Sequence, residues 1–238
     1  MSNYRVNHKS MAQEASMTIE GVKNPASSMP GKEPARVLEG FINALADTSK
    51  NSVDLRFQTL ASELEQLPRT TGQVPPHSTD SVRMWLDTAL ASMPPTIGPL
   101  TTAVTEIAQY ASWVEAARGV PELFSGGYAY AILIGQGGMI TSETMRLGLY
   151  LQRPEIDYPG HAHDAEEFYF ILSGSSHWRV DTRHFTSTAG NLIHHPPHTV
   201  HASHTRNQPL LAVWAWLGDI NGRYWFETSP ETDRPFPL

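Results

Sequence analysis

The fold of this chain is decided by one stretch, Gly160-His161-Ala162-His163-Asp164-Ala165-Glu166-Glu167-Phe168-Tyr169-Phe170-Ile171-Leu172-Ser173-Gly174. Side chains alternate between the two faces of a β-strand, so residues two apart share a face. A strand through this stretch places His161, His163, Glu167 and Tyr169 together on one face. Glu166 falls on the opposite face. The alternation therefore predicts that Glu167, and not Glu166, joins the two histidines in a polar site.

A second group of histidines follows Gly190 and surrounds Pro196-Pro197. Its members are His194, His195, His198, His201 and His204. If a strand starts after the prolines, His201 faces one side, and His198 and His204 face the other. Because the chain has no cysteine, any metal must be held by nitrogen and oxygen ligands. Imidazole and carboxylate groups on neighbouring strands suit one divalent ion such as Fe, Mn, Co, Ni or Zn.

The rest of the chain predicts an α+β protein in which helices come first and strands follow. Residues 1–33 are polar and indicate a flexible arm. Residues 34–119 carry apolar stripes at helical spacing. Two stripes stand out: Val53, Phe57, Leu60, Leu64 and Leu67, then Leu100, Val104, Ile107, Ala111 and Val114. Residues 120–238 change to a period of two, with strands expected at 128–134, 145–152, 166–172, 177–182, 198–204 and 210–217. This spacing is typical of a small antiparallel β-barrel or sandwich, and the absence of an internal repeat favours a single barrel.

Composition excludes several kinds of partner. The net charge is −7 and there is no run rich in lysine and arginine, so binding to a phosphate backbone is not expected. No stretch has the roughly 18 apolar residues of a membrane span, and the N-terminus lacks a signal-peptide pattern. We therefore expect a cytoplasmic protein without a nucleic-acid or membrane partner. Its helical stripes have to cover the barrel or pair two copies as a homodimer.

The first stretch resembles motif one of the cupin superfamily, which is His-x-His, three residues, Glu, six residues, Gly. His161, His163, Glu167 and Gly174 match this pattern without a gap. Motif two is approached by Gly190, Pro196 and His201, but it has His198 where a glycine is usual and Thr205 where an asparagine is usual. The resemblance implies a double-stranded β-helix, or jelly roll, with a metal held by His161, His163, Glu167 and His201.

Within the cupins, the chain resembles bacterial dimethylsulfoniopropionate lyases of the DddL and DddQ kind. These enzymes combine a helical N-terminal part with one cupin barrel and carry two tyrosines around motif one, where this chain has Tyr158 and Tyr169. The resemblance implies metal-dependent β-elimination of a small sulfonium carboxylate to dimethyl sulfide and acrylate. Either tyrosine could be the general base. If Trp214 and Trp216 face inward, their rings suit a sulfonium cation.

Three other interpretations fit the same residues. A cupin dioxygenase would hold Fe(II) with the same three histidines and one glutamate. A sensor of a metal or a small ligand would use the site without catalysis. A sugar-binding or storage cupin would have a site that has lost its activity.

Overall fold

The structure is a computed structural model that describes residues 34–68, 72, 74–115 and 126–227. The predicted arm at 1–33 and the expected helix end near Gly119 lie outside these residues. The helical part consists of α2 (Pro34–Lys50), α3 (Leu55–Glu65), α4 (Asp80–Ala91), the 3₁₀ turn η1 (Pro95–Ile97) and α5 (Pro99–Ala108). Within the described part of the chain, no helix is both long and apolar enough to cross a membrane.

Local chemistry explains where these helices begin. Pro34 is the first residue of α2, where its missing N–H costs no helical hydrogen bond. The carboxylate of Asp54 accepts hydrogen bonds from the backbone N–H groups of Arg56 and Phe57, so α3 starts after it. Thr79 caps α4 in the same way, because its hydroxyl oxygen accepts a hydrogen bond from the backbone N–H of Val82.

Two predicted stripes are wrong at their ends. Val53 precedes the Asp54 cap and is fully exposed. The last helix ends at Ala108, so Ala111 and Val114 lie beyond it. Trp113 instead begins a short strand that pairs with Ala131. A tertiary partner therefore overrides the helical periodicity at this point, because strand pairing satisfies the same backbone groups.

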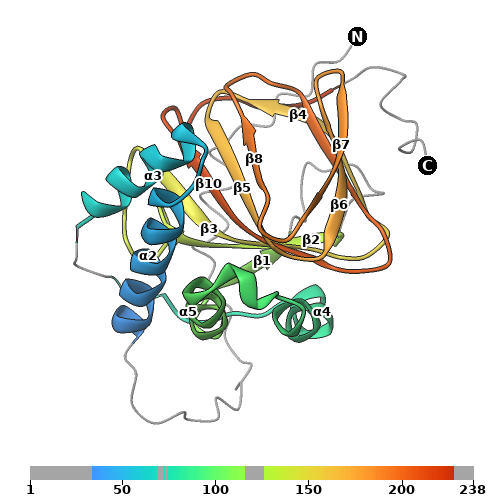
Figure 1. Ribbon diagram of the computed structural model, residues 1–238. Coiled ribbons are helices and arrows are strands. Elements are labelled where there is room, and N and C mark those ends of the chain that lie inside the picture. The colour runs from blue at the N-terminus through green and yellow to red at the C-terminus, as the bar shows by residue number, and fades with distance from the viewer. Residues whose placement is uncertain (1–33, 69–71, 73, 116–125, 228–238) are drawn as a thin grey trace.

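The strands are β1 (Trp113–Glu115), β2 (Tyr128–Ile134), β3 (Met145–Gln152), β4 (Asp157–His163), β5 (Glu166–Ser173), β6 (Ser175–Val180), β7 (Arg183–Thr188), β8 (Leu192–His195), β9 (His201–Thr205), β10 (Leu210–Leu217) and β11 (Tyr224–Phe226). They form a six-stranded sheet, β1-β2-β3-β10-β5-β8, and a five-stranded sheet, β11-β4-β9-β6-β7. All strand pairs are antiparallel. The two sheets face each other and enclose a common interior (Figure 1).

This arrangement confirms the predicted α+β class and jelly-roll architecture, with one qualification. Among the described residues the sheets remain two separate layers and do not close into a continuous hydrogen-bonded cylinder. The stretch 160–174, predicted as one strand, divides at Asp164-Ala165 into β4 and β5, which belong to different sheets. The sequence did not predict strands at 113–115, 183–188, 192–195 and 224–226. The predicted strand at 198–204 begins only at His201.

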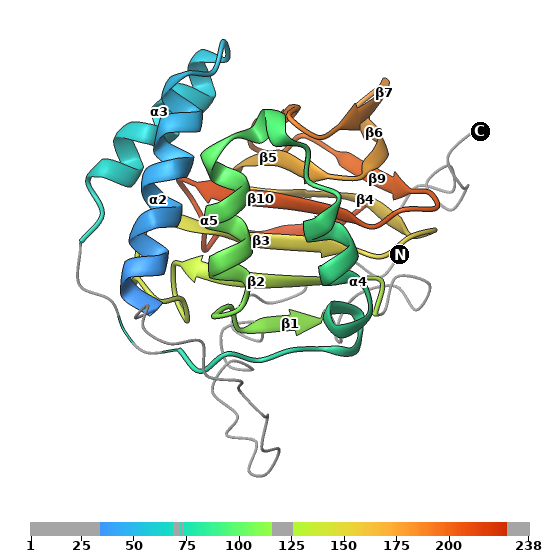
Figure 2. The same cartoon turned by 60° about the horizontal axis from the view of Figure 1, so that its bottom comes forward.

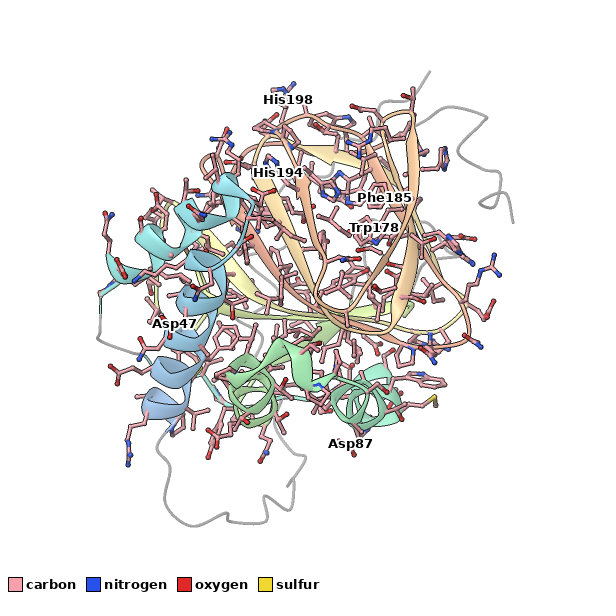
Figure 3. The ribbon with its side chains drawn as sticks, in the orientation of Figure 1. Asp47, Asp87, Trp178, Phe185, His194 and His198 are labelled. Carbon is pink, nitrogen blue, oxygen red and sulfur yellow. The ribbon has the colours of Figure 1, made fainter. Side chains whose placement is uncertain are left out.

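The helices cover the outer face of the six-stranded sheet, as Figure 2 shows from below. Phe57 of α3 stacks on Phe170 at 5.7 Å between ring centroids and contacts Phe168 at 6.1 Å. The apolar outward face of β5 is therefore covered, as its sequence required. Both faces of β3 are largely buried, because one meets the helices and the other the interior. Asp47 of α2 and Asp87 of α4 are exposed, so the helices present polar side chains to solvent at these positions (Figure 3).

Candidate metal centre

Four polar residues meet in the interior between the sheets. His161 and His163 come from β4, Glu167 from β5 and His201 from β9. Each is at most 2% exposed, and each offers a ligand atom within 4.8 Å of the others. The structure thus brings together the four residues that the sequence predicted as ligands. Glu166 faces away from them and pairs with Arg56 and His194 on the outside.

Backbone carbonyl groups hold the three imidazoles in one tautomer. Nδ1 of His161, His163 and His201 lies 2.9 Å from the carbonyl oxygens of Pro159, Ala165 and Thr199, respectively. A ring N–H that donates to a carbonyl leaves Nε2 unprotonated, which is the form that binds metals.

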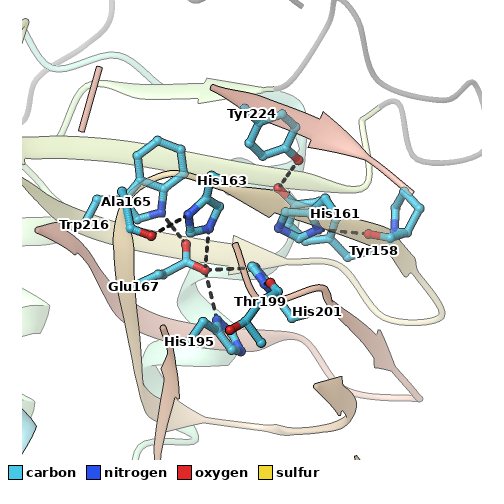
Figure 4. A network of polar contacts seen from close by, with 11 residues as sticks. Tyr158, His161, His163, Ala165, Glu167, His195, Thr199, His201, Trp216 and Tyr224 are labelled. Atoms are coloured by element: carbon cyan, nitrogen blue, oxygen red, sulfur yellow. Dashed lines mark hydrogen bonds and ion pairs between the residues drawn. The ribbon is translucent and has the colours of Figure 1, made fainter. Parts of the chain in front are cut away.

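The Nε2 atoms also point at the remaining ligand candidate. Nε2 of His163 lies 3.2 Å and Nε2 of His201 3.0 Å from Oε2 of Glu167 (Figure 4). Nε2 of His201 is buried, and its contact with Oε2 is not a hydrogen bond, because the ring proton is on Nδ1 and points at the carbonyl of Thr199. Lone pairs that converge in a buried space favour a cation between them. The donor set therefore fits a divalent transition metal.

Two further groups hold the carboxylate of Glu167. The indole Nε1 of Trp216 donates to Oε1 at 2.6 Å, and Nδ1 of His195 lies 3.0 Å from Oε2. Burial alone would raise the pKa of Glu167. The nearby imidazoles of His163, His195 and His201 outweigh burial, so its pKa lies well below the ordinary value. Glu167 is therefore an anion that is ready to bind a cation.

The turn before His201 has the geometry that the usual cupin glycine would provide. His198 occupies that position and has a φ of 68°, in the left-handed region that favours glycine. Its backbone N–H donates to the carbonyl of His163 at 2.8 Å, and its Nε2 lies 2.9 Å from Asp164. These contacts join the two motifs and hold the unusual backbone in place. His198 itself points away from the four candidate ligands, as predicted.

Both predicted tyrosines line the interior. The ring of Tyr158 stacks on His161 at 4.3 Å, and Tyr169 meets Tyr150 edge to face at 5.4 Å. The hydroxyl of Tyr158 lies 3.2 Å from that of Tyr224, which comes from β11. Burial raises the pKa of Tyr158 and of Tyr169 well above the ordinary value. Without a nearby cation, both are neutral phenols.

The two tryptophans also face inward, but they differ in their contacts. Trp214 and Trp216 meet edge to face at 5.9 Å. The indole N–H of Trp214 is buried and finds no acceptor among the described residues. That of Trp216 is bound to Glu167, and its ring lies 4.5 Å from the ring of His163. Trp216 therefore both donates a hydrogen bond to the carboxylate of Glu167 and lines the interior.

Two residues of this site were missed from the sequence. His195 is fully buried and stacks on His201 at 3.8 Å, and burial with the neighbouring His201 lowers its pKa to about 3. A strand before Pro196 would have revealed it, because His195 then shares a face with the apolar Ile193. Tyr224 belongs to the aromatic run 224–226, a recognisable β signal, but nothing local shows that this run pairs with β4.

Comparisons with known proteins agree with this arrangement. The family model described as dimethylsulfoniopropionate (DMSP) lyase matches residues 48–212, more than half of the chain. A curated relative, the DMSP lyase DddQ of Ruegeria pomeroyi, is 31% identical over 113 residues, which are 47% of this chain and 53% of that protein. The match therefore spans about half the length of the curated relative.

Two solved structures share the fold. A chain from the crystal structures of the DMSP lyases RdDddP and RnDddQII has a TM-score of 0.67 at 20% identity, covering 82% of this chain and 100% of its own. DddQ from Ruegeria pomeroyi has a TM-score of 0.60 at 24% identity, covering 81% and 98%. At these identities the likeness concerns the fold. The family model carries the assignment, and the chain belongs to the dimethylsulfoniopropionate lyase family.

Proposed function

We propose that this protein is a metal-dependent lyase that cleaves dimethylsulfoniopropionate into dimethyl sulfide and acrylate. The observation that carries the proposal is the buried centre in which three imidazole Nε2 atoms and an ionised Glu167 converge beside two tyrosines. Membership of the family supports the choice of a small sulfonium carboxylate as the substrate.

His161, His163, Glu167 and His201 would hold one divalent ion, with Fe, Mn, Co, Ni and Zn all compatible with these ligands. Such an ion supplies Lewis-acid stabilisation of the negative charge that develops beside the substrate carboxylate. The protein's own part is to keep the ligands deprotonated and oriented. The three backbone carbonyls and the indole of Trp216 support that role.

Tyr158 or Tyr169 would act as the general base. The phenolate oxygen takes the α-proton, the electron pair of the C–H bond forms the double bond of acrylate, and the β-carbon–sulfur bond breaks. Dimethyl sulfide leaves as a neutral molecule, so no general acid is required. Because burial raises the pKa of both phenols, the phenolate form requires positive charge nearby.

Aromatic side chains would receive the sulfonium group. Trp214 and Trp216 face the interior, together with the ring of Tyr150 on the neighbouring strand. Cation–π attraction to such rings contributes about 2 kcal/mol per contact where water is excluded. A cytoplasmic location and a homodimer stay predictions from the sequence.

One assay tests the function directly. Purified protein is loaded with Mn(II), Fe(II), Co(II) or Zn(II) and given dimethylsulfoniopropionate while the headspace is sampled for dimethyl sulfide. We expect dimethyl sulfide with at least one metal and none after chelation. Oxygen consumption without dimethyl sulfide would instead support a dioxygenase.

Two phenylalanine variants test the base. Tyr158→Phe and Tyr169→Phe keep the ring and delete the hydroxyl, so at least one should lose roughly 10²-fold or more in turnover with metal retained. If both variants release dimethyl sulfide at the parent rate, the tyrosine mechanism is wrong.

A further inference from the structure

Arg146 of β3 is half-buried and lies on the strand face that lines the interior of the jelly roll. It shares its face of the strand with Tyr150, whose ring lines the interior. It is also the Cα partner of Trp216, and Trp216 is the partner of Glu167 on the next strand. A guanidinium, an indole and a candidate metal-binding carboxylate therefore lie in one row across the six-stranded sheet.

No carboxylate among the described residues pairs with the guanidinium of Arg146, and the titratable group near it is the phenol of Tyr130. Its guanidinium carbon lies 5.5 Å from the ring centroid of Trp216. Among the described residues it forms no ion pair, and its buried Nε has no hydrogen-bond partner. The nearest carboxylate in the row, that of Glu167, lies beyond Trp216 and is already held by Trp216 and the imidazoles. Burial also lowers the pKa of Arg146.

A partly buried guanidinium without an anion loses hydration and gains no ion pair in return. Arginine also presents a planar fork of N–H donors that matches both oxygens of a carboxylate. The guanidinium of Arg146 therefore offers N–H donors to an anion at the end of the row that lies opposite Glu167. At the other end of the same interior lie neutral phenols, including Tyr128, Tyr150 and Tyr158.

We propose that Arg146 is the residue that recognises the carboxylate of the substrate and so sets the orientation of a zwitterion in the site. The carboxylate lies toward Arg146, while the guanidinium repels the sulfonium group and directs it along the interior toward the rings of Trp214 and Tyr150. This inference deepens the proposed function and rests on it for the identity of the substrate. Recognition of a small carboxylate, however, can be measured without turnover.

The experiment uses metal-loaded protein and propanoate, which has the carbon skeleton of the substrate without the sulfonium group. Calorimetry on Arg146→Gln and Arg146→Met should show propanoate binding weakened about 10-fold or more, since a charge-assisted pair is lost. Binding of the neutral analogue propanamide should be unchanged. Arg146→Lys, which keeps the charge but not the fork, should lose less. Arg83→Gln, which removes an exposed arginine on α4, is the matched control and should bind propanoate as the parent does.

Metal content and thermal unfolding are measured on every variant. If dimethylsulfoniopropionate is turned over, KM should rise about 10-fold in Arg146→Gln with a smaller change in kcat. The proposal is overturned if propanoate affinity stays at the parent value, if propanoate and propanamide weaken equally, or if the bound metal is lost with the affinity. A parent protein that binds propanoate through Arg146 but releases no dimethyl sulfide would refute the lyase function and leave the carboxylate site standing.

Discussion

The indole N–H of Trp216 donates to Oε1 of Glu167 at 2.6 Å, and both side chains are buried. The two residues are Cα partners on β10 and β5, so the pairing of these strands creates the contact. Because Oε1 is engaged, Oε2 is the oxygen that faces the Nε2 atoms of His163 and His201. Trp216 therefore orients the carboxylate of the candidate centre.

Trp216→Phe should weaken metal binding about 10-fold or more, because it keeps an aromatic ring but leaves Oε1 without its donor. Competition with a chelator measures the affinity. Trp214→Phe is the control: it removes an indole N–H from the same strand face, and that N–H has no protein acceptor among the described residues. Equal metal affinities in the two variants would show that the hydrogen bond does not support the ligand.

Replacing Glu167 should remove the bound metal, whereas replacing its neighbour Glu166 should not. Glu167→Ala removes the buried carboxylate that the imidazoles surround, so bound metal and activity should fall together. Glu166→Ala removes an outward carboxylate that pairs with Arg56 and should leave the metal in place. Elemental analysis of both proteins decides the matter. Full metal occupancy in Glu167→Ala would refute the ligand assignment.

The remaining ligand candidates give a parallel prediction. His163→Ala and His201→Ala should each lose metal, since each deletes an Nε2 that faces Glu167. His198→Ala should retain it, because the His198 side chain pairs with Asp164 outside the centre. A lower melting temperature is expected for His198→Ala, since alanine does not favour a φ of 68°.

Asp164 should contribute to stability in a pH-dependent way. Hydrogen bonds from the Arg223 side chain are the main cause that lowers the pKa of Asp164 from 3.8 to about 2. A lowered carboxyl pKa stabilises the folded state above the unfolded value, and this contribution is lost as pH falls from about 4 through about 2. Asp164→Asn should therefore lower the melting temperature at pH 6, with the difference from the parent shrinking below pH 4. A difference that is independent of pH would contradict this assignment.

The contact between α3 and the six-stranded sheet should be a main source of stability. Phe57 is 2% exposed and packs on Phe168 and Phe170, so Phe57→Ala should cost about 3–5 kcal/mol of unfolding free energy. Val53→Ala, at the fully exposed residue just before the same helix, should change it by less than about 0.5 kcal/mol. Denaturant unfolding of the two variants makes the comparison.

The sequence by itself determined which residues share a face. Side-chain alternation separated Glu167 from Glu166, and the helical period identified Phe57 as a core residue. Both inferences depend on local geometry that repeats along one element, so no partner has to be known. His161 and His163 lie on β4 and Glu167 on β5 of the other sheet, so alternation along one strand did not group them; the match to cupin motif one did.

Only the tertiary structure decided which elements meet. The pairing of β8 with β5 brings His195 to Glu167, and the pairing of β11 with β4 brings Tyr224 to Tyr158. The row that joins Arg146, Trp216 and Glu167 depends on the register of three strands that lie far apart in the chain. Register is fixed by packing over the whole sheet, and a shift of one residue would turn every one of these side chains to the other face.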